Sequence, residues 1–379
     1  MITSISFLAL QQYWWLLVSV LGAILVFLMF VQGGQTFIFS MGKTELERSL
    51  LVNTLGRKWE FTFTTLVTFG GAFFASFPLF YSTSFGGAYW VWTLALLAFV
   101  VQAVAYEFRS KPSNVLGKKT FEVMLFLNGL LGTVLIGTAV GTFYNGANFS
   151  HDFLNHVDWH HPARGLEAVL NLHNVLLGLT VFLLSRVLGL LYFLNTIDHE
   201  TIVQRSKKCL LYNAIPFVVA FLSFTIWLML KPGFAVNPDT AQVYMQDYKY
   251  LINLIEMPVV LVMFLLGVVG VLFGIIRTLW PGKTYDKGIW FSGIGTFLTV
   301  LSLFLIAGYN NTAFYPSLVD INQSLTITNA SSSMYTLKAM SVVSLLIPFV
   351  LAYIVVAWRS INKKKIDKSE IEDSTEHNY

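Results

Sequence analysis

The chain alternates long apolar stretches with short polar connections along almost its whole length. A helix needs about 20 consecutive apolar residues to cross the hydrocarbon core of a bilayer. The stretches that meet this requirement cover residues 13–37, 61–81, 89–106, 121–143, 166–194, 210–230, 250–276, 289–309 and 337–358. We therefore predict an all-α polytopic membrane protein with about nine transmembrane helices. Its transmembrane domain would cover residues 1–361 and its tail residues 362–379.

Lysine and arginine are distributed unevenly among the connections. The odd-numbered connections are rich in them, with Lys43, Arg48, Arg57 and Lys58 in the first and Arg109, Lys111, Lys118 and Lys119 in the third. The even-numbered connections hold few, and the fourth has only Arg164. Because Lys and Arg favour the cytoplasmic side, we expect the N-terminus outside and the C-terminus in the cytoplasm. The tail is charged and poor in apolar residues, so we expect it to be disordered.

The composition agrees with a bilayer as the solvent. The chain of 379 residues is 55% hydrophobic and 12% charged, whereas soluble domains are roughly 25% charged. So few charges do not cover a water-facing surface. The net charge of +4 is too small for the dense basic face that nucleic acids require, so no nucleic-acid partner is expected. The single cysteine, Cys209, cannot form a disulfide within the chain.

Two amides lie within the first apolar stretch. Gln32 and Gln35 flank Gly33-Gly34, and a spacing of three residues places both amides on one face of a helix. One interpretation is a hydrogen-bonded pair between helices, with the glycines permitting close approach. The other is a polar path into the membrane. The sequence leaves both open.

The charged residues in or beside the spans are the next candidates, because burying them in lipid is costly. Glu60 opens the second helix, where it either favours the helix dipole or takes up protons. Glu107 and Arg109 end the third helix, and a local ion pair is the simple explanation. Arg186 and Glu256 fall well inside the fifth and seventh predicted helices, where each needs a partner or water. A pair between these two is one solution.

The histidines do not predict a haem site. Membrane haems usually take axial His or Met ligands from inside helices, and only His173 falls within a predicted span. A hydrogen bond between packed helices is the favoured interpretation for it. His151, His156, His160 and His161 lie close together in the fourth connection. A metal is conceivable there, but a solvated loop is favoured because no rigid element holds the ligands, so no metal site is predicted.

Four motifs follow one another from the first connection to the last helix. The first runs Gly42-Lys43-Thr44-Glu45-Leu46-Glu47-Arg48 and continues to Trp59-Glu60. The second is Gly70-Gly71-Ala72-Phe73-Phe74-Ala75-Ser76-Phe77-Pro78, and the third is Glu107-Phe108-Arg109-Ser110-Lys111. The fourth combines Tyr315-Pro316-Ser317 with Asn329-Ala330-Ser331-Ser332. As an ordered set, these motifs resemble subunit II of the cytochrome bd-type quinol oxidases.

The resemblance implies a fold of two four-helix bundles plus one peripheral helix, in a bacterial cytoplasmic (inner) membrane. It implies a heterodimer with a haem-bearing subunit I, which holds two b-type haems and one d-type haem. That complex oxidises quinol and reduces oxygen to water with cytoplasmic protons in aerobic respiration. This chain itself is expected to ligate no haem, and to supply proton or oxygen access. The family also admits a bound quinone, lipid contacts and a small single-helix subunit.

The resemblance also ranks individual residues. Gln32-Gly33-Gly34-Gln35 stands where many relatives have Asp-Gly-Phe-Asp, and an amide orients water but does not ionise. Gln102 stands where several relatives have Arg. Glu60 stands where relatives have Asp after Trp, so an ionisable carboxyl is kept there and Glu60 ranks first. The proton-path candidates are Glu60, Gln32, Gln35 and Glu107. The expected structural or interface residues are Trp59, Arg109, Lys111, Arg186 and Glu256.

Two other functions compete with an oxidase subunit. A secondary transporter would place broken helices at the middle of the membrane, and Pro258 with Gly267, Gly270 and Gly274 permits some of that. These residues are explained more simply by a kink and by close helix packing. The other alternative is a purely structural membrane scaffold.

Overall fold

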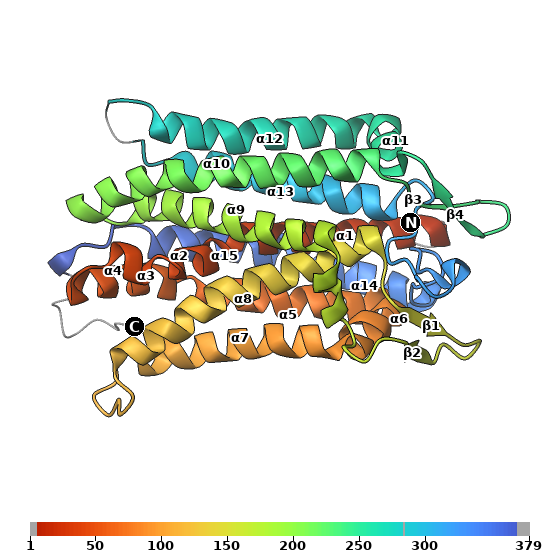
Figure 1. Ribbon diagram of the computed structural model, residues 1–379, viewed down its shortest axis with the longest axis horizontal. Coiled ribbons are helices and arrows are strands. Elements are labelled where there is room, and N and C mark those ends of the chain that lie inside the picture. The colour runs from red at the N-terminus through yellow and green to blue at the C-terminus, as the bar shows by residue number, and fades with distance from the viewer. Residues whose placement is uncertain (1–5, 283–284, 370–379) are drawn as a thin grey trace.

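The molecule is an elongated bundle whose helices run roughly along its long axis (Figure 1). The computed structural model describes residues 6–282 and 285–369. One end, which we call the basic end, holds the short helices α3 (Ile38–Met41) and α4 (Glu45–Gly56). The opposite end, which we call the strand end, holds four short strands. The connections rich in Lys and Arg meet at the basic end, as their alternation along the sequence predicts.

The long helices follow the predicted apolar stretches. They are α1 (Phe7–Leu28), α5 (Trp59–Ser76), α7 (Tyr89–Phe108), α8 (Lys118–Asn145), α9 (Leu172–Thr196), α10 (Glu200–Leu230), α12 (Pro258–Leu279), α13 (Gly288–Gly308), and α14 (Met334–Ser344) continued by α15 (Ile347–Ile361). Among the described residues, 8 spans are long and apolar enough to cross a membrane, or up to 9 if a bent pair that includes α5 counts as one. The prediction of an all-α polytopic membrane protein with about nine spans is confirmed.

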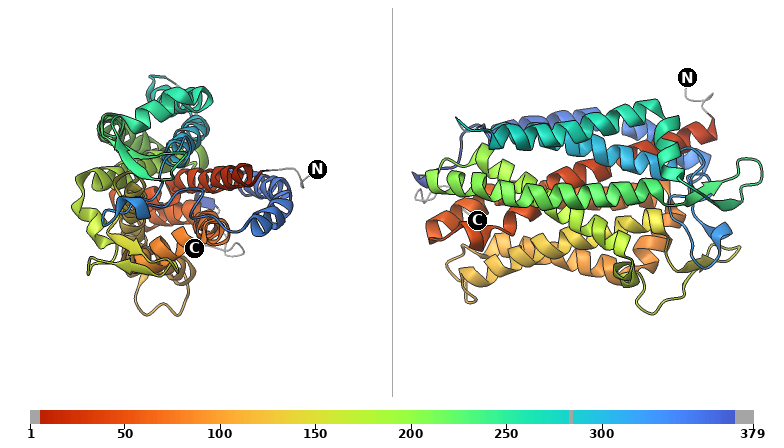
Figure 2. Two further views of the ribbon diagram at one scale, coloured as in Figure 1. Left: turned by 90° about the vertical axis from the view of Figure 1, so that its right-hand side faces the viewer. Right: turned by 45° about the horizontal axis from the view of Figure 1, so that its top comes forward.

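The long helices pack against one another in a connected series. Helix α8 packs with both α7 and α9, and α9 also packs with α10. Helix α1 packs with both α5 and α13, and α13 also packs with α12. The short helix α2 (Phe30–Gln35), which continues α1, packs against both α8 and α9. The end-on view shows α14 and α15 along the side of the molecule (Figure 2). Helix α15 has no buried residue and contacts the bundle through Trp358, so most of its surface is available to lipid or to another protein.

Two of the predicted spans are interrupted at proline. The second span ends at Ser76, and α6 (Pro78–Phe80) and the π-helix η2 (Tyr81–Gly87) turn away by 119°. The seventh is broken at Met257, between α11 (Lys249–Glu256) and α12. Proline lacks an N–H and starts a helix more readily than it continues one. Glu256 is therefore the last residue of α11, exposed at the strand end, and the prediction that it lies well inside a helix is wrong.

The fifth span begins later than predicted. Residues Leu166–Leu170 form a short 3₁₀ helix, η3, and α9 starts only at Leu172. The side chain of Asn171 caps α9 by accepting hydrogen bonds from the backbone N–H groups of His173 and Asn174. An Asn cap of this kind is a common helix start signal. The apolar pattern continues across Asn171, so it does not indicate that the helix begins there.

The polar connections carry structure that hydropathy did not predict. At the strand end, β1 (Phe149–His151) pairs antiparallel with β2 (Val157–Trp159), and β3 (Gly233–Val236) with β4 (Val243–Gln246). A 3₁₀ turn, η4 (Ile321–Gln323), follows in a later connection. At the basic end, α4 begins with a capping box between Thr44 and Glu47. Although burial opposes it, hydrogen bonds from Arg205 and Thr201 lower the pKa of Glu47 to about 2, so this carboxylate stays charged.

Close backbone approach explains the glycines of the seventh span. A Cβ atom on Gly267 would lie 2.7 Å from the backbone N of Thr299, and one on Gly274 would lie 2.8 Å from that of Ser292. Helix α12 therefore packs directly against the backbone of α13. The interpretation of these glycines as helix-packing positions is confirmed.

The first residues of the tail are ordered. Ile366 is 3% exposed and forms a parallel bridge with Ile197 at the end of α9, and Lys365 pairs with Asp286 at 2.9 Å. The expectation of disorder is wrong for residues 362–369, because one apolar side chain among many charges suffices to anchor them. Residues 370–379 lie outside the described residues.

Candidate functional site

Helix α2 carries Gln32 and Gln35 through the interior of the bundle. All its residues are buried, and two glycines press one of its faces against α9. A Cβ atom on Gly33 would lie 2.0 Å from the carbonyl O of Ser185. Because α9 occupies that side so closely, the two amide side chains extend toward α7 instead.

The two amides bond to residues one turn apart on α7. Gln32 Nε2 donates to Gln102 Oε1 at 3.2 Å, and Gln35 Nε2 donates to the Tyr106 hydroxyl at 3.0 Å. The indole of Trp59 stacks on the Tyr106 ring, with centroids 5.9 Å apart and planes at 16°. The prediction that Gln32 and Gln35 share one face is confirmed, and the hydrogen-bonded interpretation of the pair is confirmed with it.

Several polar atoms of this site have no hydrogen-bond partner in the described part of the chain. They are Gln32 Oε1, Gln35 Oε1, Gln102 Nε2, Trp59 Nε1 and both amide atoms of Asn128 on α8. Gln32, Gln35, Gln102 and Asn128 are at most 1% exposed. We call Gln32, Gln35, Gln102, Tyr106 and Asn128 the polar column. Nearly all buried polar groups in proteins bond to protein or to ordered water, so this arrangement is suited to hold water.

A buried ion pair lies on the basic-end side of the polar column. Gln102, Tyr106 and Arg109 follow the same face of α7 at spacings of four and three. The Arg109 guanidinium donates to Glu122 Oε1 at 2.8 Å and to the Ser49 hydroxyl at 3.2 Å. The second oxygen of Glu122 lies 3.1 Å from Nε of Arg48. Two arginines therefore neutralise one carboxylate, and the group holds α4, α7 and α8 together.

Glu60 lies apart from the polar column. It stands in the first turn of α5 with its side chain exposed, although its neighbour Trp59 contacts Tyr106. Lys58, two residues before Glu60, is fully buried, and its Nζ lies 4.5 Å from the centroid of the Trp358 ring. The sequence placed Glu60 first among proton-path residues, and the structure places it on the outer surface of this chain.

The remaining charged candidates each have their own partners. Glu107 pairs with Lys111 at 3.0 Å across one exposed helical turn, while Arg109 pairs with Glu122. Arg186 donates to Asn213 Oδ1 at 2.7 Å and to the Thr36 hydroxyl at 3.0 Å, with its guanidinium 4.1 Å from the Phe37 ring centroid.

Arg186 and Glu256 do not pair. Glu256 accepts a hydrogen bond from Asn310 at the strand end. The suggestion that these two residues pair is therefore wrong, because α12 begins only after Glu256 and leaves it at the opposite end of the bundle.

The one histidine inside a long helix, among the described residues, does not fit an axial haem ligand. In α9, Nδ1 of His173 lies 2.9 Å from Asn145 Nδ2 and its Nε2 lies 3.3 Å from the carbonyl O of Phe224, so both ring nitrogens are engaged. The interpretation of His173 as a packing residue is confirmed. His156 bonds to Asp152 and His160 to Ser150 on the exposed β1–β2 hairpin. The described residues contain no group of three or more His, Cys, Asp or Glu that could hold a metal ion.

Sequence reasoning missed part of the site. Glu122 and Asn128 on α8 were not singled out, and neither was Tyr106. Glu122 has a sequence signal. The chain is strongly basic from Arg109 to Lys119, and Glu122 is the one acidic residue between Arg109 and the end of the first turns of α8. Asn128 has a weaker signal, as an amide in an apolar span next to Gly129. Tyr106 has none, since an aromatic residue near a helix end is common in membrane proteins.

The comparison with protein families decides what kind of chain this is. The family "Cytochrome bd terminal oxidase subunit II" matches residues 10–361. The chain belongs to this family. Its members are subunits of an oxidoreductase complex that contains haems and a subunit I, and the resemblance stated from the motifs is confirmed.

Individual relatives cover nearly the whole chain. Cytochrome bd-I ubiquinol oxidase subunit 2 of Escherichia coli (strain K12) is 26% identical over 99% of this chain and 100% of the relative. Cytochrome bd ubiquinol oxidase subunit 2 of Bacillus subtilis (strain 168) is 29% identical over 90% of this chain and 93% of the relative. A chain from the structure of bd oxidase from Geobacillus thermodenitrificans superposes with a TM-score of 0.62 at 11% identity, covering 93% of this chain and 98% of that one. The last comparison supports the fold alone.

Proposed function

We propose that this chain is the accessory subunit of a terminal oxidase that oxidises quinol and reduces oxygen to water. Its partner, subunit I, would hold two b-type haems and one d-type haem, while this chain stabilises the partner and lets protons reach it. The observation that carries the proposal is the buried polar column. Several of its amide atoms have no hydrogen-bond partner among the described residues, and none of its residues carries a charge. A scaffold packed only for stability would satisfy or omit such groups.

The polar column supplies the first part of a proton route. Its amides cannot carry a charge, but they can orient a chain of water between the basic end and the bundle interior. Arg109 and Glu122 would frame the entrance, and the basic end would face the cytoplasm, where protons are taken up. The ionisable step would then belong to Glu60.

Glu60 heads an exposed stripe on α5 that we assign to the partner. The stripe consists of Glu60, Thr64, Val67, Gly71 and Phe74, all exposed in this chain and spaced by three or four residues. A carboxylate and a bare glycine on a membrane-facing helix are poorly suited to lipid, and well suited to a packed protein interface. From this stripe, Glu60 would pass protons into subunit I.

The transporter alternative loses its structural support. The glycines of α12 pack against α13, and Arg186 and Glu256 lie in different parts of the bundle. The scaffold alternative agrees with the same family. It differs from the proposal only in that Glu60 and the polar column would conduct no protons. A functional experiment separates these two.

The experiment replaces Glu60 by Gln in the complete complex. Oxygen consumption with excess quinol is expected to fall by about tenfold or more, because a positioned proton-transfer group commonly contributes that much. Glu45→Gln is the matched control, since Glu45 is also exposed at the basic end but pairs with Lys118. Haem content, read from the optical spectrum, must be equal in all samples. Unchanged turnover in a fully loaded Glu60→Gln complex would favour the scaffold.

A further inference from the structure

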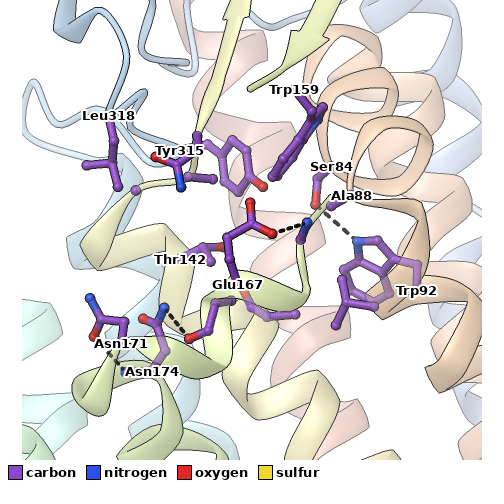
Figure 3. Close-up of a pocket in the computed structure, with 17 residues that line it drawn as sticks. Ser84, Ala88, Trp92, Thr142, Trp159, Glu167, Asn171, Asn174, Tyr315 and Leu318 are labelled. Atoms are coloured by element: carbon purple, nitrogen blue, oxygen red, sulfur yellow. Dashed lines mark hydrogen bonds between the residues drawn. The ribbon is translucent and has the colours of Figure 1, made fainter. Parts of the chain in front are cut away.

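A small cavity lies at the strand end, far from the polar column. It is formed where the π-helix η2, the start of α7, the end of α8 and η3 meet, and its volume is about 70 Å³ (Figure 3). Its lining includes Ser84, Trp92, Trp159, Glu167 and Tyr315. A π-helix is rare and is frequently found at functional sites.

Glu167 extends its carboxylate into this cavity (Figure 3). The side chain is only 8% exposed. One oxygen, Oε2, accepts a hydrogen bond from the backbone N–H of Gly165 at 2.7 Å and lies 3.5 Å from Nδ1 of His161. The other oxygen, Oε1, has no hydrogen-bond partner among the described residues. A buried carboxylate with an open oxygen needs a cation or water to offset its lost hydration.

The neighbouring polar groups are already engaged. Trp92 Nε1 donates to the Ser84 hydroxyl at 3.2 Å, and Trp159 Nε1 donates to the carbonyl O of Thr83 at 3.0 Å. Asn174 Nδ2 donates to the carbonyl O of Ala168 at 3.2 Å. The Tyr315 hydroxyl interacts with Ser84 and Thr142. None of these donors bonds to Glu167 Oε1 in the described part of the chain, so this carboxylate oxygen lies open in a cavity that the aromatic side chains of Trp92, Trp159 and Tyr315 help to line.

We propose that this cavity binds a primary ammonium group. A carboxylate oxygen accepts a hydrogen bond from the ammonium, and the aromatic rings stabilise the same cation through their π-faces. A chelated divalent metal does not fit, because the described residues contain no group of three or more His, Cys, Asp or Glu. A volume of about 70 Å³ admits a cationic group of a few heavy atoms.

The ammonium group has two possible sources with the same chemistry. One is a free small amine, and the other is the headgroup of an aminophospholipid such as phosphatidylethanolamine. The cavity is lined by the first residues of α7 and the last turns of α8, so it lies at the end of these spans, where headgroups are found. The inference concerns the strand end and does not depend on proton transfer through the polar column.

The test measures binding to the purified, haem-loaded complex. In the first arm, equilibrium dialysis with labelled methylammonium in detergent should show one saturable site per complex. Glu167→Gln should weaken this binding by about tenfold or more, because a charge-assisted hydrogen bond is replaced by a neutral one. Glu167→Asp keeps the charge but shortens its reach, and should bind with intermediate affinity. Glu256→Gln, which removes another carboxylate at the strand end, should bind as the wild type does.

In the second arm, the wild type and both Glu167 variants are placed in nanodiscs of phosphatidylethanolamine mixed with phosphatidylcholine. Native mass spectrometry should find one retained phosphatidylethanolamine on the wild type and none on Glu167→Gln if the lipid is the source. Methylammonium binding without lipid retention would identify a free amine. If the wild-type complex shows neither saturable methylammonium binding nor retained phosphatidylethanolamine, the proposal is overturned. Equal binding by the wild type and a haem-loaded Glu167→Gln complex would overturn it as well.

Discussion

The guanidinium of Arg109 and the carboxylate of Glu122 meet 2.8 Å apart in the interior of the bundle, at 1% and 2% exposure. Arg109 ends α7 and Glu122 lies in the first turns of α8, so the pair joins the two helices on either side of an exposed connection. Arg48 adds α4 to the same carboxylate. One buried carboxylate therefore ties three helices together at the basic end.

Replacing Glu122 by Gln should destabilise the chain strongly. Removing one partner of a buried ion pair leaves an uncompensated charge, which typically costs about 3–5 kcal/mol. Thermal unfolding of the purified complex should show a clear fall in its midpoint. Lys111→Gln is the control, because the exposed pair of Lys111 with Glu107 is worth about 1 kcal/mol or less. Equal midpoints for the two variants would show that Glu122 is solvated rather than buried.

Replacing Gly33 by Ala should disrupt the contact between α2 and α9. The added Cβ would lie 2.0 Å from the carbonyl of Ser185, and a backbone atom cannot move aside as a flexible side chain does. Overpacking of this kind costs roughly 1–3 kcal/mol or more, which outweighs the gain of under about 1 kcal/mol from replacing a helical glycine. Gly70→Ala is the matched control, since its Cβ would lie 3.5 Å from the nearest atom, on Phe85. Unfolding midpoints should fall for Gly33→Ala only.

Hydropathy predicted the spans because the bilayer imposes one requirement on every spanning segment. It failed where an apolar run hides a change of geometry, as at Pro78 and Pro258, since a window of apolar residues averages over a single proline. Trp14 and Trp15 stand at the start of the first predicted span, but α1 already starts at Phe7. Both indoles therefore lie within the helix, where they are 7% and 1% exposed and bond to neighbouring helices.

The candidate site was predicted in its parts but not in its connections. The spacing of Gln32 and Gln35 placed both amides on one face, and the structure confirms this. Their partners on α7 lie about 70 residues away in the chain, and one sequence contains no signal for which helix faces which. Glu60 illustrates the opposite case. Its position at the start of α5 was clear from the sequence, but its exposure depends on how α5 is rotated in the bundle.

The double variant Gln32→Leu with Gln102→Leu should separate stability from proton supply. Replacing both partners of a buried hydrogen bond by apolar groups of similar size is nearly neutral for stability, and here it also removes two orphaned atoms. If water in the polar column carries protons, oxygen consumption should fall severalfold while the unfolding midpoint stays within a few degrees. Thr296→Val removes an orphaned buried hydroxyl elsewhere and should leave turnover unchanged. Full activity of the double variant would remove the polar column from the proton route.

The exposed stripe on α5 predicts where a bulky side chain blocks assembly. Among the described residues, none lies within 4 Å of a Cβ atom on Gly71, so Gly71→Trp should leave the fold of the chain intact. If α5 docks on subunit I, the indole will occupy the volume of the partner helix, because small residues at such interfaces permit close approach. An affinity tag on this chain should then recover it without haem from detergent extracts. Leu266→Trp introduces the same ring at a 58% exposed position of α12 and should still recover the haem-bearing partner. If Gly71→Trp still recovers the haem-bearing complex and Leu266→Trp does not, the interface lies on α12. That result would overturn the assignment of Glu60 to the contact with subunit I.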